Sequence, residues 1–270
     1  MRGNLRGSNI VINGEIAPES AFGKLPVENV IYEVIRVIDS RLVFATDHLN
    51  RLKNSCEANG ITFPGEQNML AGIQLLINVT KFHLGNIKVL VFKNQSATSW
   101  ACFFIPHKYP EPFDYINGVK LKTFPFERPE PTIKKWNDKF RKEVNAYIAD
   151  NHIYEALLVN REGFITEGSR SNIFFLNKNG KIYTSPEKSV LPGITRAYVY
   201  DICKQFEYPI IEKMIHQKEL TQLSGCFLTG TSPKVLPVSK IDDVSYFPSH
   251  EIIHRIMQAF DLMVKQQKVF

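Results

Sequence analysis

The chain has 270 residues, of which 44% are hydrophobic and 22% are charged, and its formal net charge is +6. This composition is typical of a folded globular protein, which excludes a largely disordered chain, and no apolar run approaches the roughly twenty residues that span a bilayer. The first fifteen residues also lack the apolar core of a secretory signal. We therefore expect a cytoplasmic protein without a membrane partner.

The cysteines and the basic residues suggest neither a metal site nor a nucleic-acid surface. Four cysteines are scattered without a C-x-x-C motif, which favours buried, reduced thiols over a zinc site or disulfides. Eight basic residues fall between Lys120 and Lys142, but acidic residues interrupt them and no nucleic-acid motif accompanies them. We interpret them as a solvated face with anionic-ligand chemistry, and expect no nucleic-acid partner.

The N-terminal part reads as a sheet covered by helices. Asn13-Gly14 is a strong two-residue hairpin turn, and short β-prone runs follow it. Leu49, Leu52 and Cys56 recur at helical spacing. The expected elements are a hairpin over 9–16, strands over 29–37 and 41–45, a helix capped by Thr46 or Asp47, a helix over 67–84, and strands over 86–93 and 100–106.

A proline cluster divides the chain. Six of the fifteen prolines fall between Pro106 and Pro131, and such a cluster interrupts regular structure. We therefore expect a smaller N-terminal α/β domain over residues 1–115 and a larger domain over 116–270. The mixture of helices and strands indicates an α/β fold of the α+β type.

The second half mixes short strands with three helices. Val199, Ile202, Cys203 and Phe206 recur at i, i+3, i+4 and i+7, which predicts a helix that opens at Ile194-Thr195. The other expected elements are a helix beginning at 132, strands over 153–159, 164–166, 172–176, 181–184 and 226–230, and a last helix from about Ser249 with Ile252, Ile253, Met257, Phe260 and Met263 on its apolar side.

Two motifs in this half carry chemistry. E-G-S-x-S-N-x-F begins at Glu167, in a bend between two strands, and L-P-G-I-T-R begins at Leu191, where a helix starts. A helix start offers unpaired N–H groups and a positive dipole, so it suits a phosphate, and Thr195 could add a hydroxyl. Glu167 is either a solvated loop charge or the placed partner of a cation. Taken singly, each feature is more often structural.

In this order the two motifs resemble those of the class IV aminotransferases. These are the pyridoxal 5'-phosphate (PLP) enzymes of fold type IV, and they include branched-chain aminotransferase, D-amino acid aminotransferase and aminodeoxychorismate lyase. The resemblance implies a two-domain fold, a PLP cofactor and a homodimer. It also implies transfer of an amino group between a small-molecule amino acid and a 2-oxo acid.

The resemblance assigns roles to single residues. I-K-x-x-N at residues 133–137 matches the segment of the Schiff-base lysine and selects Lys134, with Lys135 as the alternative. H-x-x-R-L selects Arg51 as a phosphate ligand, and Glu167 would face the pyridine nitrogen. The other implied cofactor residues are Ser171, Asn172, Leu191, Gly193, Ile194, Thr195, Gly230 and Thr231. The implied substrate-facing residues are Tyr32, Lys88 and Ser232.

The chain departs from the family pattern where the substrate is recognised. Many relatives carry F-G-D-G before the first aromatic strand, whereas this chain has Leu25-Pro26-Val27-Glu28-Asn29. Lys88 falls near a substrate-side arginine of the branched-chain enzymes, and a lysine lacks the planar fork of that side chain. The substrate side chain and its L or D form stay open. The alternatives are an aminodeoxychorismate lyase and a non-catalytic module that keeps the fold.

One further motif has a structural interpretation. His250 to His254 spells H-E-x-x-H, the spacing of a zinc protease on a helix. After His254 the chain offers no histidine, glutamate or cysteine as a third ligand. We expect no metal site there.

Overall fold

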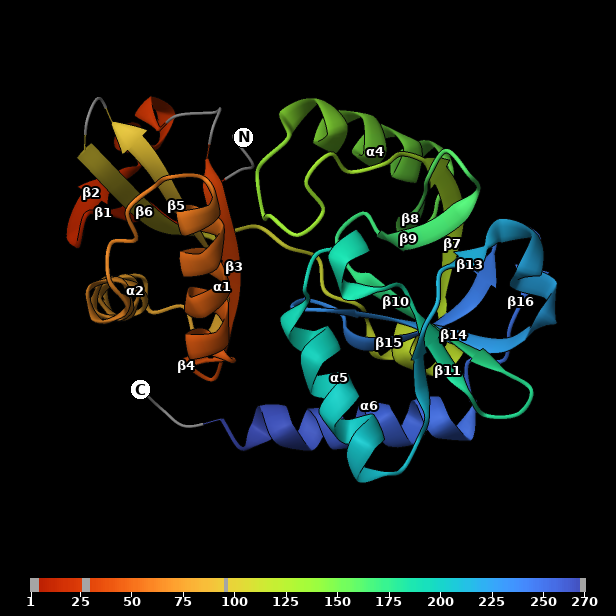
Figure 1. Cartoon of the computed structure of the whole chain (residues 1–270). Coiled ribbons are helices and arrows are strands. Elements are labelled where there is room, and N and C mark those ends of the chain that lie inside the picture. The colour runs from red at the N-terminus through yellow and green to blue at the C-terminus, as the bar shows by residue number, and fades with distance from the viewer. Residues whose placement is uncertain (1–4, 26–29, 95–96, 268–270) are drawn as a thin grey trace. The chain divides into compact units, whose positions relative to one another are not determined.

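The computed structural model describes residues 5–25, 30–94 and 97–267, and Figure 1 names its elements. Contacts divide the chain into two compact units. Unit 1 comprises Met1–Lys108, Ile133–Asp138 and Gln267–Phe270, and unit 2 comprises Tyr109–Thr132 and Lys139–Gln266. This division differs from the expected single boundary near 115, because residues 133–138 return to pair with a strand of unit 1.

Unit 1 is a sheet with two helices against one face. Its described strands form a six-stranded antiparallel sheet in the order β2-β1-β6-β5-β3-β4. Its elements are β1 (Asn9–Ile12), β2 (Glu15–Pro18), the 3-10 helix η1 (Glu19–Lys24), β3 (Ile31–Ile38), β4 (Arg41–Leu42), α1 (Ala45–Ala58), α2 (Glu66–Thr80), β5 (Leu84–Asn94) and β6 (Ala97–Ile105). The expected hairpin at Asn13-Gly14 is confirmed.

Strand β3 separates two cores by alternation of its side chains. Ile31, Ile35 and Val37 pack with α1 and α2, and α1 runs beside β3 (Figure 1). Tyr32 packs in the cluster on the opposite face. Glu33 has the parity of Ile31 and Ile35, so the sheet directs its carboxylate towards α1.

Two helix ends in unit 1 differ from the sequence prediction. The residue before α1 is Phe44, in the left-handed conformation, so Thr46 and Asp47 lie inside the first turn and do not cap it. Helix α2 ends at Thr80 rather than near 84. Lys81 adopts a left-handed φ of 56° there, which stops the helix before β5 begins.

Unit 2 contains the larger sheet. Its described strands follow the order β12-β11-β10-β14-β15-β7-β8-β9-β13, and β16 adds to β15. The elements are α3 (Pro112–Asn117), β7 (Val119–Pro125), α4 (Asp138–Asp150), β8 (Glu155–Val159), β9 (Phe164–Gly168), β10 (Asn172–Asn177), β11 (Ile182–Thr184), η2 (Glu187–Ser189), α5 (Ile194–Gln205), β12 (Ile210–Glu212), β13 (Ile215–His216), η3 (Gln217–Gln222), β14 (Leu223–Gly230), β15 (Lys234–Ile241), β16 (Val244–Ser245) and α6 (Glu251–Lys265).

One apolar cluster runs along a single face of this sheet, from β7 through β10 and β14 to β13. Helices α4, α5 and α6 lie on the other face, whereas Tyr115 of α3 packs against this cluster. Phe140 and Val144 of α4 pack on Ala156 and Leu158, and α5 and α6 lie side by side against β14 and β15 (Figure 1). The first motif forms the bend between β9 and β10, and the second leads into the start of α5.

The predicted start of α5 at Ile194 is confirmed, and two other helices differ. Helix α4 begins at Asp138 rather than at 132, because the preceding residues pair with β3. Helix α6 buries Ile253, Ile256, Phe260 and Val264, so its buried stripe is rotated from the expected one. In the described part of the chain, no helix is both long enough and apolar enough to cross a membrane.

Candidate active site

Lys134 lies at the edge of the sheet of unit 1. The backbone N–H of Tyr32 donates to the Lys134 carbonyl at 3.2 Å, and the N–H of Trp136 donates to the Val30 carbonyl at 3.2 Å. Lys135 forms an antiparallel bridge with Ile31. The segment thus runs alongside β3 and is joined to it by backbone hydrogen bonds, so its backbone conformation is set by the sheet and not by a helix start.

A buried charge cluster lies between β3 and α1. The Arg51 guanidinium donates to both Glu33 oxygens, from Nε at 2.6 Å and from Nη2 at 2.9 Å. His48 Nδ1 lies 2.9 Å from Glu33 Oε2. Such a forked arginine–carboxylate pair is strongly directional. Glu33, His48 and Arg51 are all buried.

The surroundings decide the protonation of this cluster. Burial alone would raise the pKa of Glu33, but the charges of Arg51 and Lys134 and the hydrogen bond from His48 outweigh it, and the pKa falls far below its usual value. Burial lowers the pKa of His48 despite the opposing carboxylate. The cluster therefore holds an ionised Glu33 and a neutral His48, and Lys134 lies close enough for its charge to lower the pKa of Glu33.

Sequence reasoning selected Arg51 and Lys134 but missed Glu33 and His48. The available signal was a carboxylate inside the apolar strand Ile31–Ile38, where a charge is rarely buried without a partner. The guanidinium of Arg51 is held by Glu33, and a further contact of Arg51 with a phosphate stays a prediction.

Two of the predicted substrate residues, Tyr32 and Lys88, lie on the opposite face of this sheet. Lys88 Nζ lies 3.5 Å from the Trp136 ring centroid and 5.1 Å from that of Tyr32. Lys134 Nζ lies 5.3 Å from the same Tyr32 ring. Ammonium groups at these distances are attracted to aromatic faces. The structure thus brings Tyr32, Lys88 and Lys134 together, and Lys88 is only 5% exposed.

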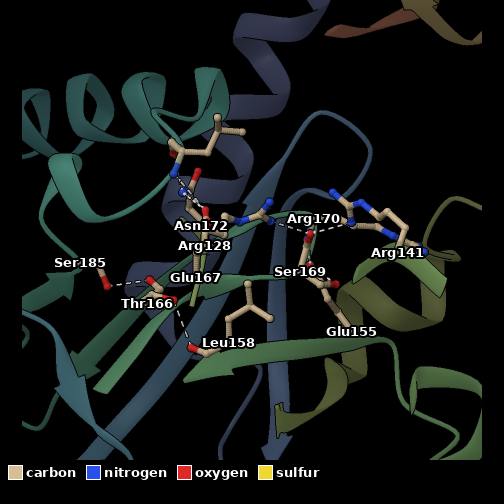
Figure 2. A network of polar contacts seen from close by, with 11 residues as sticks. Arg128, Arg141, Glu155, Leu158, Thr166, Glu167, Ser169, Arg170, Asn172 and Ser185 are labelled. Carbon is tan, nitrogen blue, oxygen red and sulfur yellow. Dashed lines mark hydrogen bonds and ion pairs between the residues drawn. The ribbon is translucent and has the colours of Figure 1, made fainter. Parts of the chain in front are cut away.

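In unit 2, Glu167 is held from both sides, as Figure 2 shows. Arg128 Nε forms an ion pair with Glu167 Oε1 at 2.5 Å. The other oxygen, Oε2, accepts from Asn172 Nδ2 at 3.4 Å and from the backbone N–H of Leu191 at 3.2 Å. The carboxylate is 3% exposed. Glu167 is therefore the placed partner of a cation, Arg128, and not a solvated loop charge. Arg128 belongs to neither sequence motif.

The start of α5 is joined to the strands by Asn172. Its Nδ2 donates to the Leu191 carbonyl at 2.9 Å. Gly193 precedes the helix, and a Cβ there would stand 2.0 Å from Asn172 Oδ1. Only glycine lets the backbone approach this closely. The first turn of α5, with the buried Thr195, is thereby held beside β10.

A buried hydroxyl lies opposite Asn172, the residue that contacts this helix start. Thr229 of β14 pairs in register with Asn172 of β10, and both strands direct these side chains to the face that α5 covers. Thr229 is 1% exposed, and within the described residues its Oγ1 has no hydrogen-bond partner. A buried hydroxyl without a partner is costly. Together with the N–H groups at Ile194 and Thr195, it makes a donor set that fits a phosphate.

The remaining predicted residues frame this part of unit 2. Gly230 ends β14 opposite Lys234, so Thr231 and Ser232 form the connection to β15. Ser171 lies in the bend before β10, where its hydroxyl donates to Glu155 at 3.0 Å and not towards Glu167. Cofactor or substrate contacts of Ser171, Gly230, Thr231 and Ser232 stay predictions.

The H-E-x-x-H segment forms the start of α6. His250 is the residue before the helix, and His254 is exposed. Burial lowers the pKa of His250. Over residues 5–25, 30–94 and 97–267, the structure contains no group of three histidine, cysteine or acidic side chains that could hold a metal ion.

Comparison with known proteins identifies the family. The family model described as amino-transferase class IV matches residues 30–241. The chain belongs to the class IV aminotransferases. The match covers the Lys134 segment and the Glu167 and Leu191 motifs, and the predicted family is confirmed.

Individual relatives agree with this assignment. A D-alanine aminotransferase from Bacillus licheniformis is 26% identical over 233 residues, which cover 78% of each chain. The branched-chain amino acid aminotransferase from Thermobaculum terrenum, solved in its PLP-containing holo form, superposes with a TM-score of 0.80 at 18% identity, covering 98% of this chain and 96% of its own. A Legionella pneumophila protein described as a candidate 4-amino-4-deoxychorismate lyase gives 0.79 at 22% identity, covering 87% and 91%.

These likenesses confirm the expected fold and the enzyme class. The solved structures share the fold of this chain, and the family model gives the enzyme class. The choice of substrate depends on the side chains of this chain.

Proposed function

We propose that this protein is a PLP-dependent aminotransferase that moves an amino group between an amino acid and a 2-oxo acid, with Lys134 as the amine that holds the cofactor. The family match supports the reaction class. The observation that carries the cofactor assignment is in unit 2. There a fixed carboxylate at Glu167 contacts the segment before α5, and Thr229, opposite Asn172, has a buried hydroxyl with no hydrogen-bond partner among the described residues.

The residues present fit this cofactor. Glu167 is buried and ionically held, so it would face a protonated ring nitrogen, and the start of α5 with Thr195 and Thr229 would hold the phosphate. Bound PLP supplies an electron-accepting ring that stabilises negative charge at the substrate Cα. The protein provides the charges and donors that orient this ring.

Lys134 would act as the acid and base of the reaction. Its amine would take the proton from the substrate Cα and would deliver it to C4′ of the cofactor. The Ile133–Trp136 segment is fixed by backbone bonds to β3, so the lysine side chain starts from a rigid point. The negative charge of Glu33 and the positive charge of Arg51 would act on the Lys134 amine together.

Lys88 would provide the positive charge for a substrate carboxylate. Its ammonium lies over the rings of Trp136 and Tyr32, which shield it from solvent and fix its position. A single point charge binds a carboxylate without the two-pronged geometry of arginine. We therefore expect Lys88→Met to raise KM for amino acids more than it lowers kcat, and Lys88→Arg to restore KM.

Attachment of the cofactor tests the choice of lysine. The purified protein is incubated with PLP, reduced with borohydride and digested, and the modified peptide is identified by mass spectrometry. The expected mark is on Lys134, with Lys135→Arg as the matched control that keeps it. Lys134→Ala should lose the mark and slow turnover by about 10²–10⁴-fold or more, because it removes the general base. A mark on Lys135 would instead make Lys135 the functional residue.

Two substrate assays separate the reactions. In one, a panel of L- and D-amino acids is offered with 2-oxoglutarate, and the new 2-oxo acid is measured. In the other, aminodeoxychorismate is offered alone, and pyruvate is measured. Amino transfer is the expected result. Pyruvate without amino transfer would show a lyase, and bound PLP without either product would show a binding module.

The assembly is part of the proposal. We expect a homodimer, on the resemblance to the family, and a cytoplasmic location. Size-exclusion chromatography with light scattering should give twice the mass of the 31.0 kDa chain. A monomeric mass in an active preparation would contradict the dimer.

A further inference from the structure

Glu155 is a buried carboxylate that the proposed reaction does not use. It opens β8 in unit 2 and is 3% exposed. Burial raises its pKa, while the Arg170 N–H, the Ser171 hydroxyl and the charges of Arg170 and Arg141 oppose this shift. A buried carboxylate in a sheet is costly unless neighbouring donors satisfy it, so its partners indicate what it does.

Within the described residues, the hydrogen bonds of the Glu155 side chain go to one bend. Its Oε1 accepts from the Arg170 backbone N–H and from the Ser169 hydroxyl at 3.3 Å, and its Oε2 accepts from the Ser171 hydroxyl at 3.0 Å. Figure 2 shows Glu155 below this bend, which joins Glu167 to Asn172. A single side chain thus spans the whole turn between β9 and β10.

The bend is built closely around this carboxylate. A Cβ on Gly168 would stand 2.2 Å from Ser171 Oγ and 2.7 Å from Glu155 Oε1. The Ser169 N–H also donates to the Ala156 carbonyl at 2.9 Å, which fixes the bend to β8. The close approach of the chain to Glu155 therefore explains why the motif has a glycine and two serines at these positions.

The bend in turn fixes an arginine. The Ser169 carbonyl accepts from Arg128 Nη2 at 3.0 Å and from Arg141 Nη1 at 2.8 Å. Arg128 is the same residue whose Nε pairs with Glu167. The guanidinium is thereby held at two points, and one of them depends on where Glu155 holds Ser169.

We propose that Glu155 is a positioning residue, which holds the Ser169–Ser171 bend so that Arg128 and the backbone together fix the carboxylate of Glu167 for the cofactor ring nitrogen. This inference rests on the proposed PLP function. Glu155 itself touches no reacting atom. Removal of the Glu155 carboxylate should weaken the contact between Glu167 and the ring nitrogen and leave the phosphate contacts at α5 intact.

Paired ligands test this idea without activity. The dissociation constants of PLP and of 1-deaza-PLP, which has carbon in place of the ring nitrogen, are measured by fluorescence titration of the cofactor-free protein. Wild type should prefer PLP. Glu155→Ala should reduce that preference by about tenfold or more, as expected when a charge-assisted contact is lost. Glu155→Gln, which keeps the shape and one acceptor oxygen, should restore most of it.

Two controls separate positioning from general stability. Tyr246→Phe removes another buried hydrogen bond of unit 2, to the Leu220 carbonyl, and should lower the melting temperature without changing the preference. In a Glu167→Ala background, Glu155→Ala should change the preference no further. If Glu155→Ala fails to fold, Glu155→Asp, which is too short to reach both ends of the bend, should give an intermediate loss.

The outcomes are distinguishable. If wild type binds neither ligand, the proposed function fails. If wild type binds both equally, the role of Glu167 fails. If wild type prefers PLP and Glu155→Ala weakens both ligands by the same factor, Glu155 is structural only, and the inference is overturned.

Discussion

Thr229 and Asn172 face each other across β14 and β10, yet only one of them is satisfied. Asn172 donates to the Leu191 carbonyl and to Glu167, whereas the Thr229 hydroxyl has no hydrogen-bond partner within the described residues. The register that pairs them places an unused hydroxyl beside the start of α5. We interpret it as a ligand donor kept at the expense of stability.

Thr229→Val should therefore have effects of opposite sign. Valine has nearly the same shape, and it removes a buried polar group that costs about 1–3 kcal/mol when unsatisfied. The cofactor-free protein should melt at a higher temperature, whereas PLP should bind more weakly. Scanning fluorimetry of the cofactor-free protein and calorimetric titration with PLP measure the two effects. A lower melting temperature with unchanged PLP affinity would contradict the assignment.

Gly193→Ala should disturb the start of α5. The new Cβ would stand 2.0 Å from Asn172 Oδ1 and 3.3 Å from Arg196 Cβ, so either the helix start or Asn172 must move. We expect weaker binding of PLP and of inorganic phosphate alone, measured by titration. Gly23→Ala is the matched control, because a Cβ there meets no atom within 4 Å. Equal phosphate affinity in the two variants would remove the helix start from the site.

Glu33→Gln should be among the most destabilising single changes in unit 1. It leaves Arg51 buried with its main counter-charge removed, and breaking a buried pair in this way costs about 3–5 kcal/mol. Chemical denaturation measures the loss. Glu57→Gln is the control, because its pair with Lys53 is exposed at 4.0 Å and should contribute less than about 1 kcal/mol. Similar losses in both variants would refute the buried cluster.

His48 predicts the pH dependence of stability. The pKa of His48 is about 6.5 in the unfolded chain and lower in the folded protein. At a pH between the folded and the unfolded pKa, the unfolded chain binds more protons, so the free energy of unfolding falls as the pH is lowered. The slope from this one group is at most about 1.4 kcal/mol per pH unit. His48→Asn keeps a donor towards Glu33 without this titration, so its stability should change less between pH 7 and pH 5. The same slope in both proteins would show that His48 is already charged.

The local pattern of the chain predicted many elements correctly. The hairpin at Asn13-Gly14, the helix opening at Ile194 and the strand that ends at Gly230 follow from turn chemistry and side-chain period, which are properties of neighbouring residues. The predictions failed where distant segments interact. The sequence predicts a helix start over residues 133–137, but this segment pairs with β3 at the edge of the sheet.

The loop at Leu25–Asn29 lies largely outside the described residues, since these end at Leu25 and resume at Val30. A role of this loop in substrate recognition therefore stays a prediction.

The sequence by itself determined the family and selected Lys134, Arg51 and Glu167, because a motif preserves the order and spacing of residue types. Tertiary structure alone supplied the partners, which are Glu33 for Arg51 and Arg128 for Glu167. The reason is physical. A buried charge is stabilised by whichever group the fold brings within hydrogen-bonding distance, and that group can lie at any separation along the chain.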